Sequence, residues 1–264
     1  MFSFLHRPSP DRPVGLAFSD RSGGVSGGAF GPLNLGRTDV DDLAAVGENF
    51  ERVRRVLGFG PIITLAQVHG PEVVIVDEAL LAGWTERQHL GSEATGTPLQ
   101  RADALVTDRT GVALCIRVAD CLPVLFADAS VGVVGAAHAG RVGLAAGVLT
   151  NTVATMRDLG ATDIRAWLGP HICGACYEVP AAMRDEIGEQ LPGAYAETSW
   201  GTPALDLGAA ADRQLRDLGC VVERHSPCTR TSPDLHSHRR DGAGAGRLGA
   251  FVWLPAQSVS VLGA

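Results

Sequence analysis

Short runs of mostly apolar residues recur along the chain and predict β-strands. Several follow one another between residues 102 and 139, separated by short turns, at residues 104–107, 112–118, 122–128 and 131–137. These runs are apolar at most positions instead of alternating, so we expect their sheet to be covered on both faces. Further strands are predicted at residues 14–19, 62–68, 72–77, 164–168, 220–223 and 250–254.

Helical periodicity appears between these strands. Residues 42–57 are predicted to form a helix, because apolar residues recur there at spacings of three and four and form one face. Asp41 or Asp42 can cap its start, and Gly58 can end it. Further helices are predicted at residues 142–159, 181–191 and 206–218. Strands joined by crossover helices indicate an α/β protein. Because no linker is apparent within residues 1–264, we expect one domain.

Other segments show neither period. Residues 1–13 are rich in proline and are predicted to form a loose arm. Residues 22–36 are rich in glycine but contain Phe30, Leu33 and Leu35, so we expect an ordered loop that can line a site. Residues 82–101 are polar and are predicted to form a mobile loop.

Composition narrows the class of protein. The formal net charge of −7 disfavours a nucleic-acid partner, because neutralising phosphates requires a basic surface. No apolar run reaches the roughly 18 residues of a membrane span, and the N-terminus lacks the apolar segment of a signal peptide. We therefore expect a cytoplasmic protein with no membrane partner, whose six cysteines remain reduced.

Three motifs place a metal-binding side chain at the end of a predicted element. His69 ends a strand in Gln-Val-His-Gly, Cys121 lies between two strands in Asp-Cys-Leu-Pro, and His138 lies where a strand meets a helix in His-Ala-Gly. Two histidines and a cysteine suit zinc with one open position, which is typical of catalytic sites. Each residue taken singly is more often an ordinary packed side chain.

Other chemistry is compatible with these cysteines and histidines. Cys121 and His138 could act as nucleophile and base, as in cysteine hydrolases, but not while both bind a metal. Cys173 and Cys176 form a CxxC motif, for which a non-redox role is favoured because no second CxxC completes a zinc site. Further candidate metal ligands are His171, His225, His236 and His238.

The sequence resembles the YfiH-like family at QVHG, VADCLPVLFAD and GAAHAG, and the resemblance extends from GVSGGAFGPLNLG to SPDLHSHRRDGAGAGRLGAFVWL. The resemblance implies a layered α/β sandwich of mixed β-sheets flanked by helices. It also implies that His69, Cys121 and His138 bind one zinc ion and form the catalytic centre. Cu²⁺ can replace Zn²⁺ in such a site, because the affinity order favours copper.

Family members have been named polyphenol oxidases or laccases and later purine nucleoside phosphorylases. The resemblance therefore implies phosphorolysis of adenosine, inosine and methylthioadenosine, with purine nucleoside and phosphate as the partners, together with adenosine deamination. Zinc-activated water is the nucleophile in other zinc deaminases. The alternatives are a peptidoglycan-editing hydrolase that removes serine from a muropeptide precursor, a copper-dependent polyphenol oxidase, and a non-catalytic zinc-stabilised module.

Several polar residues are candidates for substrate binding. Arg239, Arg240 and Arg247 are predicted phosphate ligands, since guanidinium binds phosphate in a bidentate manner, although Arg239 and Arg240 are equally compatible with a solvated turn. Asn34 on the glycine-rich loop is predicted to contact substrate, although a role as a turn residue is equally compatible with its position. Arg141 stands where the family often has tryptophan, and Val142 replaces a basic residue, so Arg141 is predicted to take over part of that contact.

Overall fold

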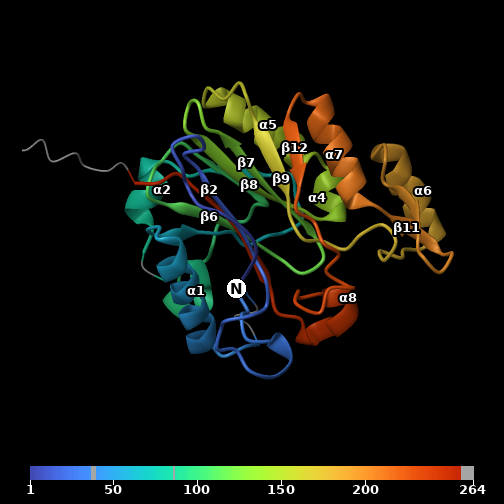
Figure 1. Ribbon diagram of the computed structural model, residues 1–264, viewed down its shortest axis with the longest axis horizontal. Helices are drawn as coiled ribbons and strands as arrows, with labels where there is room; N and C mark the ends of the chain where they lie inside the picture. Colours follow the sequence, from blue (N-terminus) through green and yellow to red (C-terminus); the bar gives the residue numbers. More distant parts are fainter. Residues whose placement is uncertain (37–39, 86, 257–264) are drawn as a thin grey trace, which may run out of the picture.

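Two β-sheets stacked face to face form the centre of the computed structural model, which describes residues 1–36, 40–85 and 87–256 (Figure 1). Within these residues, one sheet is five-stranded and has the order β1 (Phe2–His6), β2 (Gly15–Ser19), β13 (Leu248–Trp253), β6 (Ala113–Val118) and β3 (Ile62–Ile63). The described part of the other sheet is six-stranded, in the order β12 (Val221–Arg224), β9 (Arg165–Leu168), β7 (Leu122–Asp128), β8 (Val133–Ala139), β5 (Ala104–Thr107) and β4 (Val73–Ile75).

Both sheets are mixed. In the six-stranded sheet β7 and β5 pair antiparallel with β8, whereas β4 pairs parallel with β5 and β12 parallel with β9. A small antiparallel pair, β10 (Tyr195–Glu197) and β11 (Pro203–Leu205), lies at the periphery beside α6 (Ala181–Gln190). These pairings confirm the predicted mixed sheets.

The core consists of three apolar layers, and strand β7 shows how they arise. Leu125 points into the layer between the sheets, where it meets Trp167 and Phe18. Val124 and Phe126, its neighbours in sequence, point to the other face and pack under α5 (Val148–Asp158) and α7 (Leu207–Asp217). Because side chains alternate along a strand, a strand covered on both faces is apolar throughout. The prediction that this sheet is covered on both faces is therefore confirmed.

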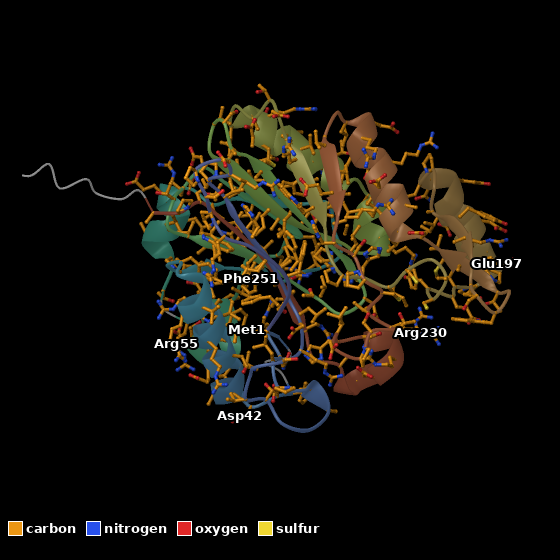
Figure 2. All side chains as sticks on the ribbon, viewed as in Figure 1. Met1, Asp42, Arg55, Glu197, Arg230 and Phe251 are labelled. Atoms are coloured by element: carbon orange, nitrogen blue, oxygen red, sulfur yellow. The ribbon has the colours of Figure 1, made fainter. Side chains whose placement is uncertain are left out.

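The outer face of the five-stranded sheet is covered by α1 (Leu43–Leu57), which confirms the predicted helix. Asp42 caps its first turn by accepting a hydrogen bond from the Ala44 N–H at 2.9 Å, and Gly58 ends it with φ of 73°. Phe251 of β13 lies in the interior beneath this helix, whereas Arg55 projects from its outer side (Figure 2). Together these layers confirm the α/β sandwich flanked by helices.

The structure corrects several predictions of local structure. The prediction of a loose arm at residues 1–13 is wrong for residues 2–6, which form β1 and extend the sheet next to β2. This short strand was not predicted because the residues that follow it are rich in proline. The helix predicted at 142–159 is divided into α4 (Arg141–Ala145) and α5, because Gly147 adopts φ of 94° between them. The strand predicted at 62–68 is reduced to β3, after which the chain turns towards His69.

Residues 82–101 are more structured than predicted. They contain the end of α2 (Glu78–Gly83), the 3₁₀-helix η2 (Gln88–Leu90) and α3 (Ser92–Thr95), and Leu90 is fully buried against α1. Glu86 lies outside the described residues. The glycine-rich segment is ordered as predicted, with η1 (Gly28–Phe30) followed by buried Leu33 and Leu35. Helix α8 (His238–Asp241) and η3 (Gly242–Gly244) were not predicted.

Every described helix falls short of the length and apolar character that a membrane crossing requires.

Candidate metal centre

His69 lies on a sharp turn at one edge of the two sheets. Its φ of 63° is uncommon for a residue other than glycine. Hydrogen bonds from the residues before and after it stabilise this conformation. The backbone N–H groups of Val68 and Gly70 both donate to Oδ2 of Asp103, at 3.0 and 2.7 Å. One buried carboxylate therefore fixes the turn that presents His69.

Cys121 lies in the tight connection between β6 and β7. Asp120, which precedes it, has φ of 87°, and its carboxylate accepts hydrogen bonds from the Thr229 hydroxyl and the Arg239 N–H, both at 2.6 Å. Segments more than a hundred residues later in the sequence thus hold the turn that carries Cys121.

His138 lies near the end of β8 and is almost completely buried. Its Nδ1 lies 2.7 Å from Oδ1 of Asp103, and its backbone N–H donates to the Asp103 carbonyl at 2.7 Å. Gly140 follows, where an added Cβ would lie 2.6 Å from Cδ2 of His69 and 3.3 Å from Sγ of Cys121. A side chain at position 140 would therefore collide with the ligand cluster.

The structure brings together the three side chains that the sequence motifs singled out. One nitrogen or sulfur atom from each of His69, Cys121 and His138 lies within 4.8 Å of the others. Sγ of Cys121 is 3.8 Å from Nε2 of His69, and the two imidazole rings are 4.7 Å apart between centroids. Two imidazoles and one thiolate are suitable ligands for a single transition-metal ion. The residues present therefore fit a metal.

Asp103 completes this arrangement. A carboxylate on Nδ1 of a histidine fixes its tautomer and leaves Nε2 available, as is usual for metal-binding histidines. Burial raises the pKa of Asp103, but hydrogen bonds from His138, Gly70 and Val68 outweigh it and leave the pKa below its ordinary value. Sequence reasoning missed this residue; its signal was an acidic side chain at the start of a fully apolar strand.

The electrostatics of the cluster favour a thiolate. Burial raises the pKa of Cys121, but hydrogen bonds and positive charge from His138 and then His69 lower it to about 6. Burial lowers the pKa of His138, but the hydrogen bonds with Asp103 and Cys121 raise it to about 9. A thiolate is the form in which cysteine binds a metal.

The cluster opens into a cavity of about 770 Å³. Arg117 and Arg247 also line this cavity, so it is suited to an anionic ligand. Arg247 was predicted to bind phosphate, and the structure places it in this lining. Arg117 was missed, although an arginine within the apolar run of β6 is an identifiable signal. His238, at the start of α8, contributes a further imidazole.

Arg141 and Arg239 line a smaller adjoining pocket of about 170 Å³, which shares Cys121 and His238 with the main cavity. Arg239 donates to the Glu178 carbonyl at 2.9 Å and lies over the ring of Tyr177. Both arginines therefore line a pocket that reaches Cys121 of the metal-binding cluster.

Two residues predicted to bind substrate make contacts within the chain. Asn34 is fully buried; its amide group donates to Asp41 and its oxygen accepts from the N–H groups of Gly36 and Arg247. The guanidinium of Arg240 donates to backbone carbonyls and to the neighbouring Asp241. These contacts order the loops around the cavity.

The other histidines do not form a second cluster with His238 in the part of the chain that the structure describes. His171 hydrogen-bonds the Gly169 carbonyl and His236 the Leu33 carbonyl, both in buried positions.

Comparisons with known proteins identify related sequences and structures. Residues 15–255 match the model of a family described as multi-copper polyphenol oxidoreductase laccase. The chain is 47% identical over 256 residues to the purine nucleoside phosphorylase ORF3 of Streptomyces griseus, covering 94% of this chain and 98% of that protein. Among solved structures, YlmD from Geobacillus stearothermophilus is similar with a TM-score of 0.79 and 30% identity, over 96% of each chain. The YfiH protein of Bacillus licheniformis has a TM-score of 0.80 at 28% identity, over 91% and 92%.

Proposed function

The chain belongs to the YfiH-like family, whose sequence model is described as multi-copper polyphenol oxidoreductase laccase, and we propose that it is a purine nucleoside phosphorylase with zinc bound by His69, Cys121 and His138. The observation that carries this proposal is a His–Cys–His cluster in an arginine-lined cavity, in a chain 47% identical to a purine nucleoside phosphorylase.

The reaction requires an anion beside the glycosidic bond. A phosphate oxygen attacks C1′ of the ribose, the C1′–N9 bond breaks, and the purine leaves with the electron pair and takes up a proton. Arg117 and Arg247 line the cavity, and they would bind the phosphate through charge-assisted hydrogen bonds. A bound metal supplies Lewis acidity in the same cavity.

His238 is suited to deliver the proton to the purine. Among the described residues of the cavity lining it is the one imidazole outside the ligand cluster. Its Nδ1 lies 2.9 Å from the Gly242 carbonyl, so Nδ1 carries a proton and Nε2 is left to exchange one with a ligand. Proton transfer by a positioned histidine typically contributes about a hundredfold or more to a rate.

The substrates are adenosine, inosine and methylthioadenosine. A cavity of about 770 Å³ is within the usual range for small-molecule sites and has room for a nucleoside with phosphate. Adenosine deamination is proposed as a second activity of the same site; a metal held by His69, Cys121 and His138 would supply the Lewis acidity that activates water for replacement of the 6-amino group with release of ammonia. The reaction takes place in the cytoplasm, where free thiols such as those of the six cysteines remain reduced.

An assay with adenosine in the presence and absence of phosphate tests the proposal. Chromatography separates adenine, inosine and hypoxanthine. Zinc-loaded protein should release adenine only with phosphate, Cys121→Ala should abolish this release, and inosine should form without phosphate. No turnover of any nucleoside by the folded, zinc-loaded protein would contradict the proposal. Serine release from a muropeptide precursor would then support the peptidoglycan-editing alternative, and oxidation of phenols by the Cu²⁺-loaded protein would support the oxidase alternative.

A further inference from the structure

A second group of metal-binding side chains lies outside the cavity. The Sγ atoms of Cys173, Cys176 and Cys228 all lie within 4.8 Å of one another, and all three are free thiols. Cys176 is buried, whereas Cys173 and Cys228 are partly exposed. Within the described residues, this cluster and the cavity lining share no residue. The CxxC motif therefore has a third sulfur that its sequence spacing did not reveal.

We propose that Cys173, Cys176 and Cys228 form a second metal site, which binds one Zn²⁺ or another thiophilic ion through three thiolates. The fourth position of a tetrahedral zinc ion remains for solvent or an added ligand. Each thiol loses its proton as the ion binds.

Backbone hydrogen bonds hold the sulfurs together without an ion. The N–H groups of Cys176 and Tyr177 donate to the Cys173 carbonyl, at 2.9 and 3.0 Å, and fold the CxxC segment into a turn. The Thr229 N–H donates to the His171 carbonyl at 3.0 Å and fixes Cys228 beside this turn. The site is therefore preorganised, so little ordering of the chain opposes metal binding.

One backbone hydrogen bond reaches the sulfur of Cys228. The backbone N–H of Cys173 donates to Sγ of Cys228 at 3.4 Å. N–H donors to ligating sulfurs are common around metal–thiolate centres.

The distances suit zinc better than they suit a disulfide. Zn–S bonds of about 2.3 Å at tetrahedral angles place sulfurs about 3.8 Å apart. Sulfurs already within 4.8 Å of one another reach that separation with small side-chain movements. A disulfide requires about 2.05 Å, uses only two of the three sulfurs, and needs an oxidant. Three converging thiols therefore favour a metal ion.

The cluster joins two segments that support the first metal centre. Thr229, next to Cys228, donates to the carboxylate of Asp120, which precedes Cys121. Tyr177, next to Cys176, lies under Arg239 at the adjoining pocket. An ion at the cysteine cluster would hold these segments together and stabilise the wall of the cavity.

Metal stoichiometry tests this inference. Full-length protein is stripped of metal in oxygen-free reducing buffer, equilibrated with Zn²⁺, desalted and analysed by mass spectrometry for bound zinc. The wild type should retain about two ions per chain, and both His69→Ala and Cys228→Ser should retain about one. Cys220→Ser is the matched control. It removes a buried cysteine on the face of the six-stranded sheet that α5 and α7 cover, and it should leave both ions bound.

Cobalt distinguishes the two sites. In the His69→Ala variant, Co²⁺ should produce strong thiolate-to-cobalt charge-transfer absorption, and adding Cys228→Ser should remove it. Circular dichroism checks folding, and Cys173→Ser provides the same readout if Cys228→Ser does not fold. The inference is overturned if the wild type binds one ion and Cys228→Ser leaves that number unchanged, or if protein alkylated during lysis carries a Cys173–Cys228 disulfide.

Discussion

Replacing Asp103 with asparagine should weaken metal binding while leaving the fold intact. One carboxylate oxygen of Asp103 accepts from the backbone on both sides of His69, and the other contacts Nδ1 of His138. In Asp103→Asn, the amide oxygen keeps the two backbone donors, and the amide nitrogen then faces Nδ1. Because an amide nitrogen only donates, Nδ1 must become an acceptor and the imidazole proton moves to Nε2. Nε2 is the atom that His138 has available for a metal.

The expected magnitude follows from these contacts. Loss of such a supporting hydrogen bond typically lowers metal affinity by about 10- to 100-fold, which corresponds to about 1.4–2.7 kcal/mol. The lost charge-assisted hydrogen bond should also reduce the free energy of unfolding by about 1.5–3 kcal/mol. The loss of affinity must therefore be separated from the loss of stability.

Asp128→Asn provides the matched control. Asp128 is also a buried carboxylate; one of its oxygens accepts from the N–H groups of Thr162 and Asp163, and the other from Ser130. It lies at the end of β7 away from Cys121. Zinc affinity is measured by competition with a chromogenic chelator, and stability by urea unfolding of the metal-free proteins. Asp103→Asn should reduce both the zinc affinity and the free energy of unfolding, whereas Asp128→Asn should reduce only the free energy of unfolding. If Asp103→Asn binds zinc within about twofold of the wild type, Asp103 does not position His138.

Three further predictions concern the cavity and the core. Gly140→Ala should lower zinc affinity by about tenfold or more in the chelator assay, because the new Cβ would meet the His69 ring at 2.6 Å; wild-type affinity would contradict the geometry. Arg247→Ala should raise KM for phosphate by about tenfold or more, because Arg247 lines the cavity, whereas Arg240, which is not among the described lining residues, should on replacement by alanine lower Tm with little change in that KM. Burial lowers the pKa of His89 to about 4, below its unfolded value of about 6.5, so protons bind the unfolded chain preferentially. Protonation of His89 in the unfolded chain therefore lowers the free energy of unfolding as the pH falls from 6.5 towards 4, by about 2 kcal/mol at pH 5. Urea unfolding of His89→Leu should show a smaller loss of this free energy between pH 7 and pH 5 than the wild type.

The elements that position the metal centre were largely predictable, for identifiable physical reasons. Strands β5 to β8 are buried on both faces and are therefore apolar at most positions. Helix α1 carries its own capping residues in Asp42 and Gly58. The sequence motifs also placed His69, Cys121 and His138 at or near the ends of elements, where side chains of several strands can meet.

The remaining features depend on contacts between distant segments. Asp103 acts through the turn at His69, and the turn at Asp120 is held by Thr229, so neither role is visible in local sequence. Cys228 lies beside the CxxC motif in a part of the fold where β12 pairs with β9. The contacts of Arg240 with backbone carbonyls were not predictable either, because sequence does not reveal which carbonyls a guanidinium will contact.

Phosphorus NMR can show whether the His69, Cys121 and His138 cluster supports phosphorolysis of purine nucleosides. Inosine and inorganic phosphate are supplied to protein that was stripped of metal and reloaded with zinc. A ribose 1-phosphate signal should grow in step with hypoxanthine release, require the reloaded metal and be absent in Cys121→Ala. If ribose 1-phosphate forms equally well in the metal-free protein or in Cys121→Ala, or does not form at all, the cluster does not support this reaction.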